Sequence, residues 1–265
     1  MFTSIILGLI EGITEFLPIS STGHLILANQ FFTFANSEFA HTFDIFIQLG
    51  AILAVLIYYR RRLIPYIGQS DPQTNRQIIS LWTKTIIAFL PAGFFGFLFG
   101  GWIQDNLFSP LVVAITLLIG GLIIIFLEKH PRPTITKNQD QISTKQSLII
   151  GLCQCLGMIP GTSRSAATII AGLFLGFSRP VATEFSFFLA VPTLGAASVY
   201  SLLKTNLAFS SNEIIWLTLG FITAFFVSYL VISKFIHYIA KHNFIPFGYY
   251  RIGLALIIIG YFFFR

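Results

Sequence analysis

Charged side chains are scarce in this chain. Lys, Arg, Asp and Glu together make up only 10% of its 265 residues, whereas hydrophobic residues make up 55%. Soluble domains carry about a quarter charged residues, so the composition excludes an ordinary soluble protein. A membrane-spanning helix needs about 20 predominantly apolar residues. We therefore predict an all-α polytopic membrane protein with six transmembrane helices, at approximately residues 42–59, 83–103, 109–127, 185–203, 214–233 and 245–264.

Cysteine is almost absent as well. The chain has only Cys153 and Cys155, in a C-x-C pattern with no second cysteine cluster elsewhere. A disulfide framework is therefore excluded, and a cysteine-based metal site is not indicated. We interpret the two as small packing residues.

Lys and Arg are absent from residues 1–41 and from the short segment 104–110. The chain thus begins without the basic region that starts a cleavable signal. Glu11 and Glu15 also interrupt the first apolar run, so no cleavable signal is predicted.

Basic residues are concentrated after the first, third and fifth predicted spans and before the fourth: Arg60, Arg61, Arg62, Arg76, Lys84, Lys129, Arg132, Lys137, Lys145, Arg179, Lys234 and Lys241. Only Lys204 and Arg265 would lie on the other side. Because cytoplasmic loops are enriched in Lys and Arg, we predict that the basic loops are cytoplasmic and that both termini face outward. The net charge of +6 is then a topology signal, and no nucleic-acid partner is expected. Arg251, inside the last span, is expected to snorkel to the cytoplasmic side.

Two further apolar segments, residues 4–32 and 147–177, are interrupted near their middle by Pro18 and by Pro160-Gly161. Proline removes a backbone donor, and backbone groups freed at membrane depth must be satisfied by protein or trapped water. Each segment is therefore predicted to be a re-entrant helix–loop–helix hairpin. A kinked full span is the alternative, which the charge distribution disfavours because an extra crossing would put basic loops on opposite sides.

The two interrupted segments resemble each other. GLIEGITEFLPISSTGHLI aligns with GLCQCLGMIPGTSRSAATI if one residue is gapped, so that Pro18 matches Pro160 and Ser21 matches Ser163. One hairpin followed by three spans then occurs twice. Because three is odd, the second copy must be inverted in the membrane.

We accordingly predict a single integral membrane domain, residues 1–265. It consists of two inverted repeats, approximately 1–127 and 145–265, joined by a cytoplasmic loop at 128–144. In inverted repeats the loops of the broken helices lie face to face near the midplane of the bilayer and build a site there.

The first hairpin concentrates ionisable and hydroxyl groups in the stretch EGITEFLPISSTGHL. Glu11 and Glu15 are four residues apart, so both carboxylates share one face of a helix. Carboxylate oxygens suit a hard divalent cation, and we predict Glu11 and Glu15 as ligands of Mg²⁺ or Ca²⁺. The proline is followed by Ser20, Ser21, Thr22 and His24.

The second hairpin is suited to an anion. PGTSRSAAT is a Gly- and Ser-rich turn that leads into a helix and presents backbone N–H groups. Arg164 adds a planar, charged fork that matches phosphate oxygens. The predicted substrate-binding residues are Ser20, Thr22, Gly161, Thr162, Ser163, Ser165 and Thr168.

An acidic wall opposite an anion-binding wall favours phosphoryl transfer, in which Arg164, turn amides and a metal offset the charge of the transferring group. Ser21 is the candidate nucleophile because it lies three residues from His24 on the same helical face. His24 is the candidate general acid or base, and Glu15 and Arg164 complete the predicted catalytic set. A metal-bound water is the alternative nucleophile.

Each of these residues also has a structural interpretation. A single intramembrane Glu can be paired structurally, and a Ser-Thr run can simply cap a helix. The two loops together favour function, because ionisable groups at membrane depth are costly. Asp44, Gln48 and Glu184, near span ends, either support the site or lie at the membrane interface.

The stretches EGITEFLPISSTGHL, QLGAILAV, GLCQCLGMIPGTSRSAATI and EFSFFLAVPTLGA closely resemble the undecaprenyl-diphosphatase family of the bacitracin-resistance type. The resemblance extends over nearly the whole chain. It implies a metal-dependent integral enzyme of the bacterial inner (plasma) membrane, with re-entrant hairpins in an inverted repeat and an active site opening to the outer, periplasmic side. The family's motif residues correspond, without substitution, to Glu11, Glu15, Ser21, His24, Ser163, Arg164 and Thr168.

The activity that the resemblance implies is hydrolysis of undecaprenyl diphosphate to undecaprenyl phosphate and phosphate, which recycles the lipid carrier of peptidoglycan synthesis and gives bacitracin resistance. The prenyl chain must stay among membrane lipids while the diphosphate reaches the cavity, so access must be lateral. A polyprenyl-phosphate flippase or other anion transporter is the main alternative, because inverted repeats with broken helices are common in transporters. The oligomeric state is left open, a homodimer included.

Overall fold

The computed structural model describes residues 1–65, 72–204 and 209–263, and within these ranges the chain forms helices and no strand. Arg265, which entered the orientation argument, lies outside the described residues. In chain order the helices are α1 (Phe2–Thr14), α2 (Ser21–Ala28), α3 (Ser37–Tyr58), α4 (Arg60–Leu63), α5 (Pro72–Leu107), α6 (Pro110–Lys129), α7 (Thr144–Gln154), α8 (Arg164–Phe174), α9 (Arg179–Leu202), α10 (Ser211–Ile239) and α11 (Ile245–Phe263), with the short 3₁₀ helices η1 (Gln139–Gln141) and η2 (Cys155–Met158).

Six of these helices, α3, α5, α6, α9, α10 and α11, are long and apolar enough to cross a membrane. They coincide with the six predicted spans, which confirms a multi-pass helical membrane protein. Several helices are longer than the apolar runs that predicted them. Helix α5 begins with the polar stretch PQTNRQ, whose first residue is a proline, and proline is tolerated in the first turn because the N–H that it lacks has no helical partner there.

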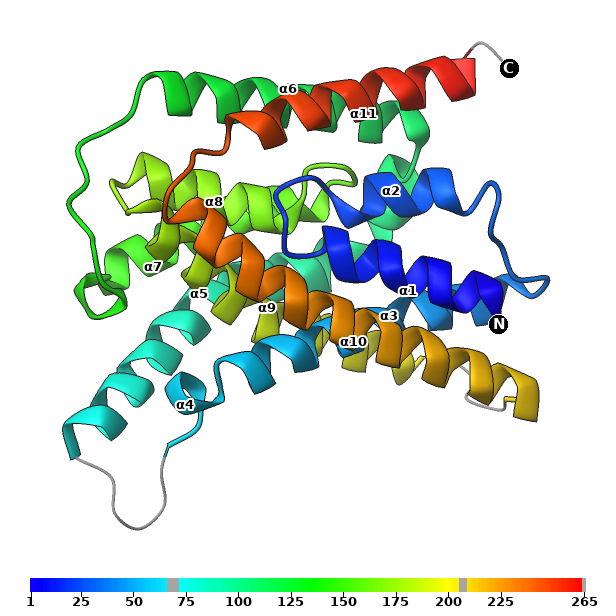
Figure 1. Ribbon diagram of the computed structural model, residues 1–265, viewed down its shortest axis with the longest axis horizontal. Coiled ribbons are helices and arrows are strands. Elements are labelled where there is room, and N and C mark those ends of the chain that lie inside the picture. The colour runs from blue at the N-terminus through cyan, green and yellow to red at the C-terminus, as the bar shows by residue number, and fades with distance from the viewer. Residues whose placement is uncertain (66–71, 205–208, 264–265) are drawn as a thin grey trace.

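The two interrupted segments are each divided into two helices at the predicted places. Helix α1 ends before Pro18 and α2 begins at Ser21, while α7 and η2 end before Pro160 and α8 begins at Arg164. Each second helix starts with a serine N-cap. In Figure 1, α1 and α2 fold back on each other, so that the start of α1 and the end of α2 lie at the same end of the molecule.

Each half of the chain contributes one long helix that packs against helices of the other half. Helix α10 packs on α1 and α3, whereas α5 packs on α7 and α9. Helices α6 and α11 lie side by side along one edge (Figure 1). The connections α3–α4, α6–α7 and α10–α11 lie at the opposite end from the start of α1 and the end of α11 (Figure 1).

Close approach of α1 and α7 to their partners depends on glycine. A Cβ on Gly8 would lie 2.6 Å from the carbonyl oxygen of Gly220 in α10, and one on Gly151 would lie 2.2 Å from that of Ala88 in α5. Gly8 and Gly151 occupy matching positions in the aligned stretches GLIE and GLCQ. Each hairpin is therefore seated against a long helix by the same residue type at the same position.

Candidate active site

The turns between the paired helices have nearly the same backbone conformation. Ser20 has φ 71° and ψ 100°, and Ser163 has φ 68° and ψ 114°. They are the only non-glycine residues with positive φ within the described residues. This conformation costs about 1–3 kcal/mol per residue and persists only where the surroundings enforce it. The backbone thus pairs Ser20 with Ser163, whereas the sequence alignment paired Ser21 with Ser163.

Each of these serines caps the helix that follows it. Ser20 Oγ accepts a hydrogen bond from the Gly23 N–H, and Ser163 Oγ accepts one from the Ala166 N–H, both at 3.2 Å. The shift by one residue arises because one residue separates Pro18 from Ser20 but two separate Pro160 from Ser163. Ser21 and Arg164 consequently become equivalent positions, each the first residue of its helix.

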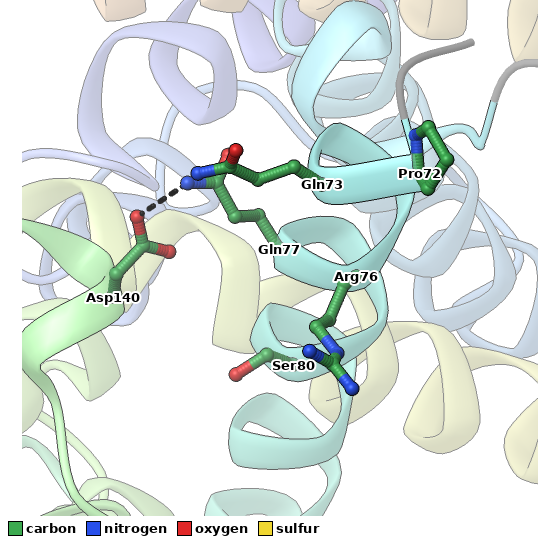
Figure 2. A pocket seen from close by; sticks show the side chains of 6 residues that line it. All are labelled: Pro72, Gln73, Arg76, Gln77, Ser80 and Asp140. Carbon is green, nitrogen blue, oxygen red and sulfur yellow. Dashed lines mark hydrogen bonds between the residues drawn. The ribbon is translucent and has the colours of Figure 1, made fainter.

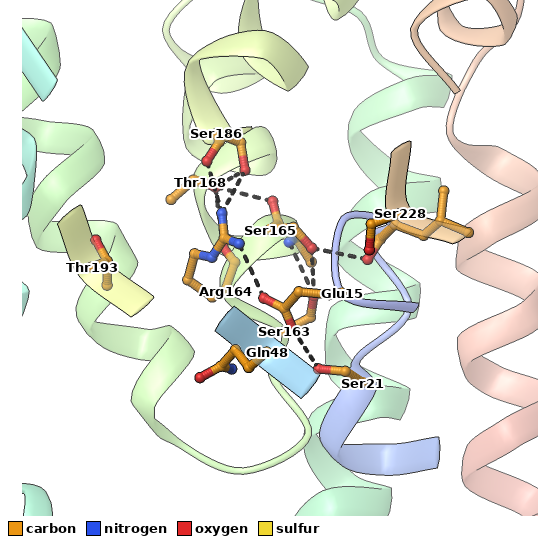
Figure 3. A network of polar contacts seen from close by, with 12 residues as sticks. Glu15, Ser21, Gln48, Ser163, Arg164, Ser165, Thr168, Ser186, Thr193 and Ser228 are labelled. Carbon is orange, nitrogen blue, oxygen red and sulfur yellow. Dashed lines mark hydrogen bonds and ion pairs between the residues drawn. The ribbon is translucent and has the colours of Figure 1, made fainter. Parts of the chain in front are cut away.

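Both hairpins meet at the carboxylate of Glu15. Ser21 Oγ donates a hydrogen bond of 2.7 Å to Glu15 Oε2, and Arg164 Nη2 donates one of 3.1 Å to Glu15 Oε1 (Figure 3). Glu15 and Arg164 are both buried, with 6% and 9% of their surface exposed. The structure therefore joins three predicted catalytic residues, separated by up to 149 positions in the chain, in one continuous chain of hydrogen bonds.

Arg164 is held from the other side by a residue that the sequence analysis missed. Its Nη1 donates to the carbonyl oxygen of Ser186 in α9 at 2.7 Å. Thr168 Oγ1 in turn donates to Ser186 Oγ at 2.7 Å, so Thr168 supports Arg164 through Ser186 (Figure 3). Ser186 is fully buried, and the only sequence signal for it is a single serine within the apolar run FSFFLAV.

The remaining hydroxyls of the second turn connect it to the first. Ser163 Oγ lies 3.0 Å from Ser165 Oγ, and Ser165 Oγ donates to the carbonyl oxygen of Leu17 at 2.9 Å. Ser163 and Ser165 therefore lie where the second turn meets the first. Thr22 is half-buried in the first turn of α2, and within the described residues its side chain makes no hydrogen bond.

His24 has different partners from those expected. Its Nδ1 lies 2.7 Å from the carbonyl oxygen of Ser20, and its Nε2 lies 2.7 Å from the hydroxyl of Tyr250 in α11. The two rings are also stacked, with centroids 5.5 Å apart. A proton on Nδ1 satisfies both contacts, since Nδ1–H then donates to Ser20 and Nε2 accepts from Tyr250. Ser21 is thus hydrogen-bonded to Glu15 and not to His24.

Glu11 is the second carboxylate of the site. It is 2% exposed, and its Oε1 has no hydrogen-bond partner within the described residues. Glu15 and Asp44 lie close enough to interact with it electrostatically. A buried, unpartnered carboxylate oxygen suits a hard cation. The described residues contain no group of three His, Cys, Asp or Glu side chains that could hold a metal.

The residues near span ends separate into two groups. Asp44 lies near Glu11, and Gln48 lies beside the polar network in Figure 3 and accepts a hydrogen bond from Ser198. Glu184 instead forms an ion pair of 2.9 Å with Arg62, a largely exposed residue of α4. Glu184 therefore links α9 to α4.

The snorkelling predicted for Arg251 is wrong. Its side chain is 0% exposed and turns inward to backbone carbonyls, among them those of Gly161 and Thr162. The Thr162 N–H is also occupied, since it donates to the carbonyl oxygen of Ile159. Gly161 and Thr162 thus present carbonyl oxygens to an arginine, where the sequence had suggested N–H groups facing an anion.

A separate pocket lies at the N-terminal end of α5. It encloses about 810 Å³ and is lined by Pro72, Gln73, Arg76, Gln77, Ser80 and Asp140 (Figure 2). Gln77 donates to Asp140 across it at 3.1 Å. None of the predicted site residues lines this pocket, so it is distinct from the cluster around Glu15.

The comparisons with known proteins all point to one family. The chain is 49% identical over 261 residues to undecaprenyl-diphosphatase 1 of Chromobacterium violaceum, covering 98% of this chain and 96% of that protein. It is 47% identical over 265 residues to undecaprenyl-diphosphatase 1 of Clostridioides difficile, covering 99% and 96% of the two chains. A family model described as bacitracin resistance protein BacA matches residues 4–257. The chain therefore belongs to the bacitracin resistance protein BacA family.

Proposed function

We propose that this protein hydrolyses undecaprenyl diphosphate to undecaprenyl phosphate and inorganic phosphate, and so recycles the lipid carrier of peptidoglycan synthesis. Relatives that bear the name of this activity match the chain over nearly its full length. The structural observation that best supports a phosphatase is the Ser21 hydroxyl bonded to Glu15, whose other oxygen binds Arg164. The Ser21 hydroxyl, the Glu15 carboxylate that can act as its base and the guanidinium of Arg164 are then directly connected.

In the first step, Ser21 Oγ attacks the terminal phosphorus and its proton passes to Glu15 Oε2. The bond between that phosphorus and the bridging oxygen breaks, so undecaprenyl phosphate leaves and a phosphoserine remains. Water then attacks the phosphoserine and the bond to Ser21 Oγ breaks. Oγ regains a proton from Glu15, which takes one from the water and later releases it. Direct attack by water, the alternative, would leave no phosphoserine, so acid quenching and mass spectrometry distinguish the two routes.

Arg164 and the start of α8 would hold the transferring phosphoryl group. The Arg164 Nε–H is buried and has no hydrogen-bond partner within the described residues, so a phosphate oxygen would satisfy it. Ser163, Ser165 and Thr168 keep Arg164 and its turn in place through the contacts described above. Ser20 and Thr22 form the facing turn. In this proposal the arginine offsets charge that increases on the phosphoryl oxygens during transfer.

We further propose that a divalent cation, Mg²⁺ or Ca²⁺, binds at Glu11 and Glu15. The unpartnered Oε1 of Glu11 supports this, because a buried carboxylate oxygen without a partner is costly. When bound, the cation would neutralise part of the negative charge of the diphosphate. Asp44 lies near enough to contribute to the same electrostatic environment.

His24 remains in the proposal as a second acid–base group. Its Nδ1 is tied to the Ser20 carbonyl, so proton exchange falls to Nε2. That nitrogen faces the hydroxyl of Tyr250, a residue with an exposed side chain. His24 would therefore exchange protons through Nε2, on the side of the site where the exposed Tyr250 lies.

We propose that residues 4–32 and 147–177 are re-entrant hairpins within a single integral membrane domain made of two inverted repeats, 1–127 and 145–265. Three observations support the repeat: Gly8 and Gly151 in matching contacts, Ser20 and Ser163 in matching conformations, and the exchanged packing of α5 and α10. We place the protein in the bacterial inner membrane, with both termini and the site opening on the outer side and the basic loops, including 128–144, in the cytoplasm.

The experiment that tests the proposed activity measures phosphate release from a C55 polyprenyl diphosphate by the purified protein in detergent. We expect release with Mg²⁺ or Ca²⁺, loss of release with EDTA, and recovery when the cation is restored. Ser21→Ala is expected to abolish release in a normally folded protein. Failure of well-folded wild-type protein to release phosphate would contradict the proposal.

A flippase or anion transporter remains the second candidate, because the two broken helices and the exchanged packing are features of transporters. The Ser21 hydroxyl distinguishes the two functions, since a transporter has no need of a nucleophile. In proteoliposomes, Ser21→Ala should abolish phosphate release. Transport of a polyprenyl phosphate that is lost in this variant while hydrolysis is retained would favour the transporter.

A further inference from the structure

Arg251 makes an unusual set of contacts for a residue in the middle of an apolar helix. Its guanidinium donates to five backbone carbonyl oxygens: Nε to Leu117 at 3.3 Å, Nη1 to Pro18 at 3.2 Å, and Nη2 to Thr116 at 3.1 Å, Gly161 at 3.2 Å and Thr162 at 3.0 Å. The side chain is 0% exposed. All three of its nitrogens are thus used, and all of them bind main chain.

These carbonyls belong to three separate parts of the fold. Pro18 lies in the first turn, Gly161 and Thr162 lie in the second, and the other two acceptors lie in α6. A planar guanidinium with five N–H donors can bridge three segments, which the compact ammonium of a lysine cannot do. Arg251 therefore binds both turns at once from α11.

No carboxylate forms an ion pair with Arg251 within the described residues. A buried cation without a counter-ion is costly and is stabilised here only by carbonyl dipoles. An apolar side chain would fill the same space without that cost. The contacts thus indicate a requirement specific to the two turns, beyond the packing of α11 on α6.

Helix α6 is shaped to admit this side chain. A Cβ on Gly120 would lie 2.4 Å from Nη2 and 2.9 Å from Cζ of Arg251. Any larger residue at position 120 would therefore displace the guanidinium. By contrast, a Cβ on Gly253, two residues from Arg251 on α11, would meet no atom within 4 Å.

The two turns that Arg251 bridges carry the groups of the proposed reaction. Pro18 lies two residues before Ser20, and Thr162 directly precedes Ser163, so the bridged carbonyls flank the two serines in positive-φ conformations. Just beyond them, Ser21 and Arg164 meet at Glu15. A displacement of one turn relative to the other would change the geometry of these three groups directly.

We propose that Arg251 is a positioning residue of the phosphatase site: it fixes the two turns relative to each other, and so sets the alignment of Ser21 and Glu15 with Arg164. It does not touch the reacting atoms. The inference rests on the function proposed above. A change at Arg251 leaves the side chains of both turns present and alters only how the two turns are placed relative to each other. Substrate binding is therefore affected less than the alignment needed for phosphoryl transfer.

The test compares Arg251→Lys, Gly120→Ala and the control Gly253→Ala in the purified full-length protein. Arg251→Lys keeps the positive charge but removes the planar guanidinium and its five N–H donors. Gly120→Ala displaces the guanidinium without removing it. For both we expect kcat for C55 polyprenyl diphosphate to fall about a hundredfold, the size of effect that misplacement by about 1 Å produces. KM should change less than about threefold. The control should behave as wild type.

Thermal unfolding in detergent separates positioning from structure. A lowered melting temperature with unchanged kcat per folded molecule in both Arg251→Lys and Gly120→Ala would overturn the inference, since it is the result of a purely structural role. Arg251→Met removes the guanidinium from all five carbonyl oxygens and can fail to fold, so the result does not depend on it. If wild type releases no phosphate, the proposed function fails and the inference fails with it. If wild type is active and both variants match it, only the inference fails.

Discussion

Glu15 is shared by both hairpins, since one of its oxygens accepts from Ser21 and the other from Arg164. Glu15→Gln keeps the size of the side chain but cannot take the serine proton. We expect kcat for phosphate release to fall by about 10²–10⁴-fold, the usual contribution of a general base. Glu38→Gln, at an exposed position on α3, is the matched control. Near-normal kcat in a folded Glu15→Gln protein would place the base elsewhere.

Tyr250 and its neighbour Tyr249 form a natural comparison. The Tyr250 hydroxyl binds His24 Nε2 at 2.7 Å, whereas Tyr249, which is 58% exposed, makes no such contact with any residue that the structure describes. Tyr250→Phe keeps the stacked ring and removes only the hydrogen bond, whose net value is about 0.5–1.5 kcal/mol. We expect kcat/KM to fall about three- to tenfold, with a changed pH profile, while Tyr249→Phe matches wild type. Identical profiles for the two variants would exclude a role for this contact.

At the level of the helices, the hairpins depend on close contact with their long partners. Gly8→Ala and Gly151→Ala would each place a methyl group against a carbonyl oxygen, at 2.6 and 2.2 Å. Overpacking typically costs about 1–3 kcal/mol, more than the gain of up to about 1 kcal/mol in helix propensity. Both variants should therefore have lower melting temperatures in detergent. The control Gly195→Ala, which meets no atom within 4 Å, should not.

The effects of Gly8→Ala and Gly151→Ala should also be additive, because the two contacts involve different helices, α10 and α5. An unchanged melting temperature in either variant would show that its hairpin can move away from its partner. That result would weaken the argument that the two hairpins are equivalent.

The helices and their interruptions could be predicted because they depend on local properties. Apolar length determines which segments can span, and Pro18 and Pro160 interrupt a helix where each lies next to a Ser- or Gly-rich turn. Proline alone does not decide this, because Pro91 and Pro192 lie inside the continuous helices α5 and α9. The direction of a polar side chain within a span is different, because it depends on which helix packs against it. Arg251 sits in the stretch YYR, which looks like an interfacial group, and only the contact of α11 with α6 and the two turns reveals its inward position.

The site itself could be predicted in composition but not in pairing. Glu15, Ser21 and Arg164 were identified from residue type, whereas the bond between Ser21 and Glu15 depends on how the first turn reverses the chain. The pairing of Ser20 with Ser163 likewise depends on backbone conformation, which a gapped alignment cannot locate to a single residue. Ser186 and Tyr250 lie on distant helices and had no distinguishing local pattern.

For the whole molecule, the decisive question is whether the first hairpin returns to the side from which it starts. Phe2 precedes the hairpin, Glu38 follows it, and both are exposed. In a background with Cys153 and Cys155 replaced by alanine, Phe2→Cys and Glu38→Cys would each carry one thiol. We expect a membrane-impermeant thiol reagent to label both in right-side-out membrane vesicles. Lys137→Cys, in the exposed loop before α7, should be labelled only after the membrane is opened.

The three positions separate the competing topologies. If α1 and α2 together made a kinked span, Phe2 and Glu38 would lie on opposite sides, and only one of the two cysteines would react. If the orientation were reversed, Lys137→Cys would react in closed vesicles and the other two would not. Labelling of Phe2→Cys and Glu38→Cys alone, from outside, requires that the first hairpin is re-entrant. Because three spans then separate Glu38 from Lys137, the second repeat must enter from the cytoplasmic side, which brings its turn towards the first one at Glu15.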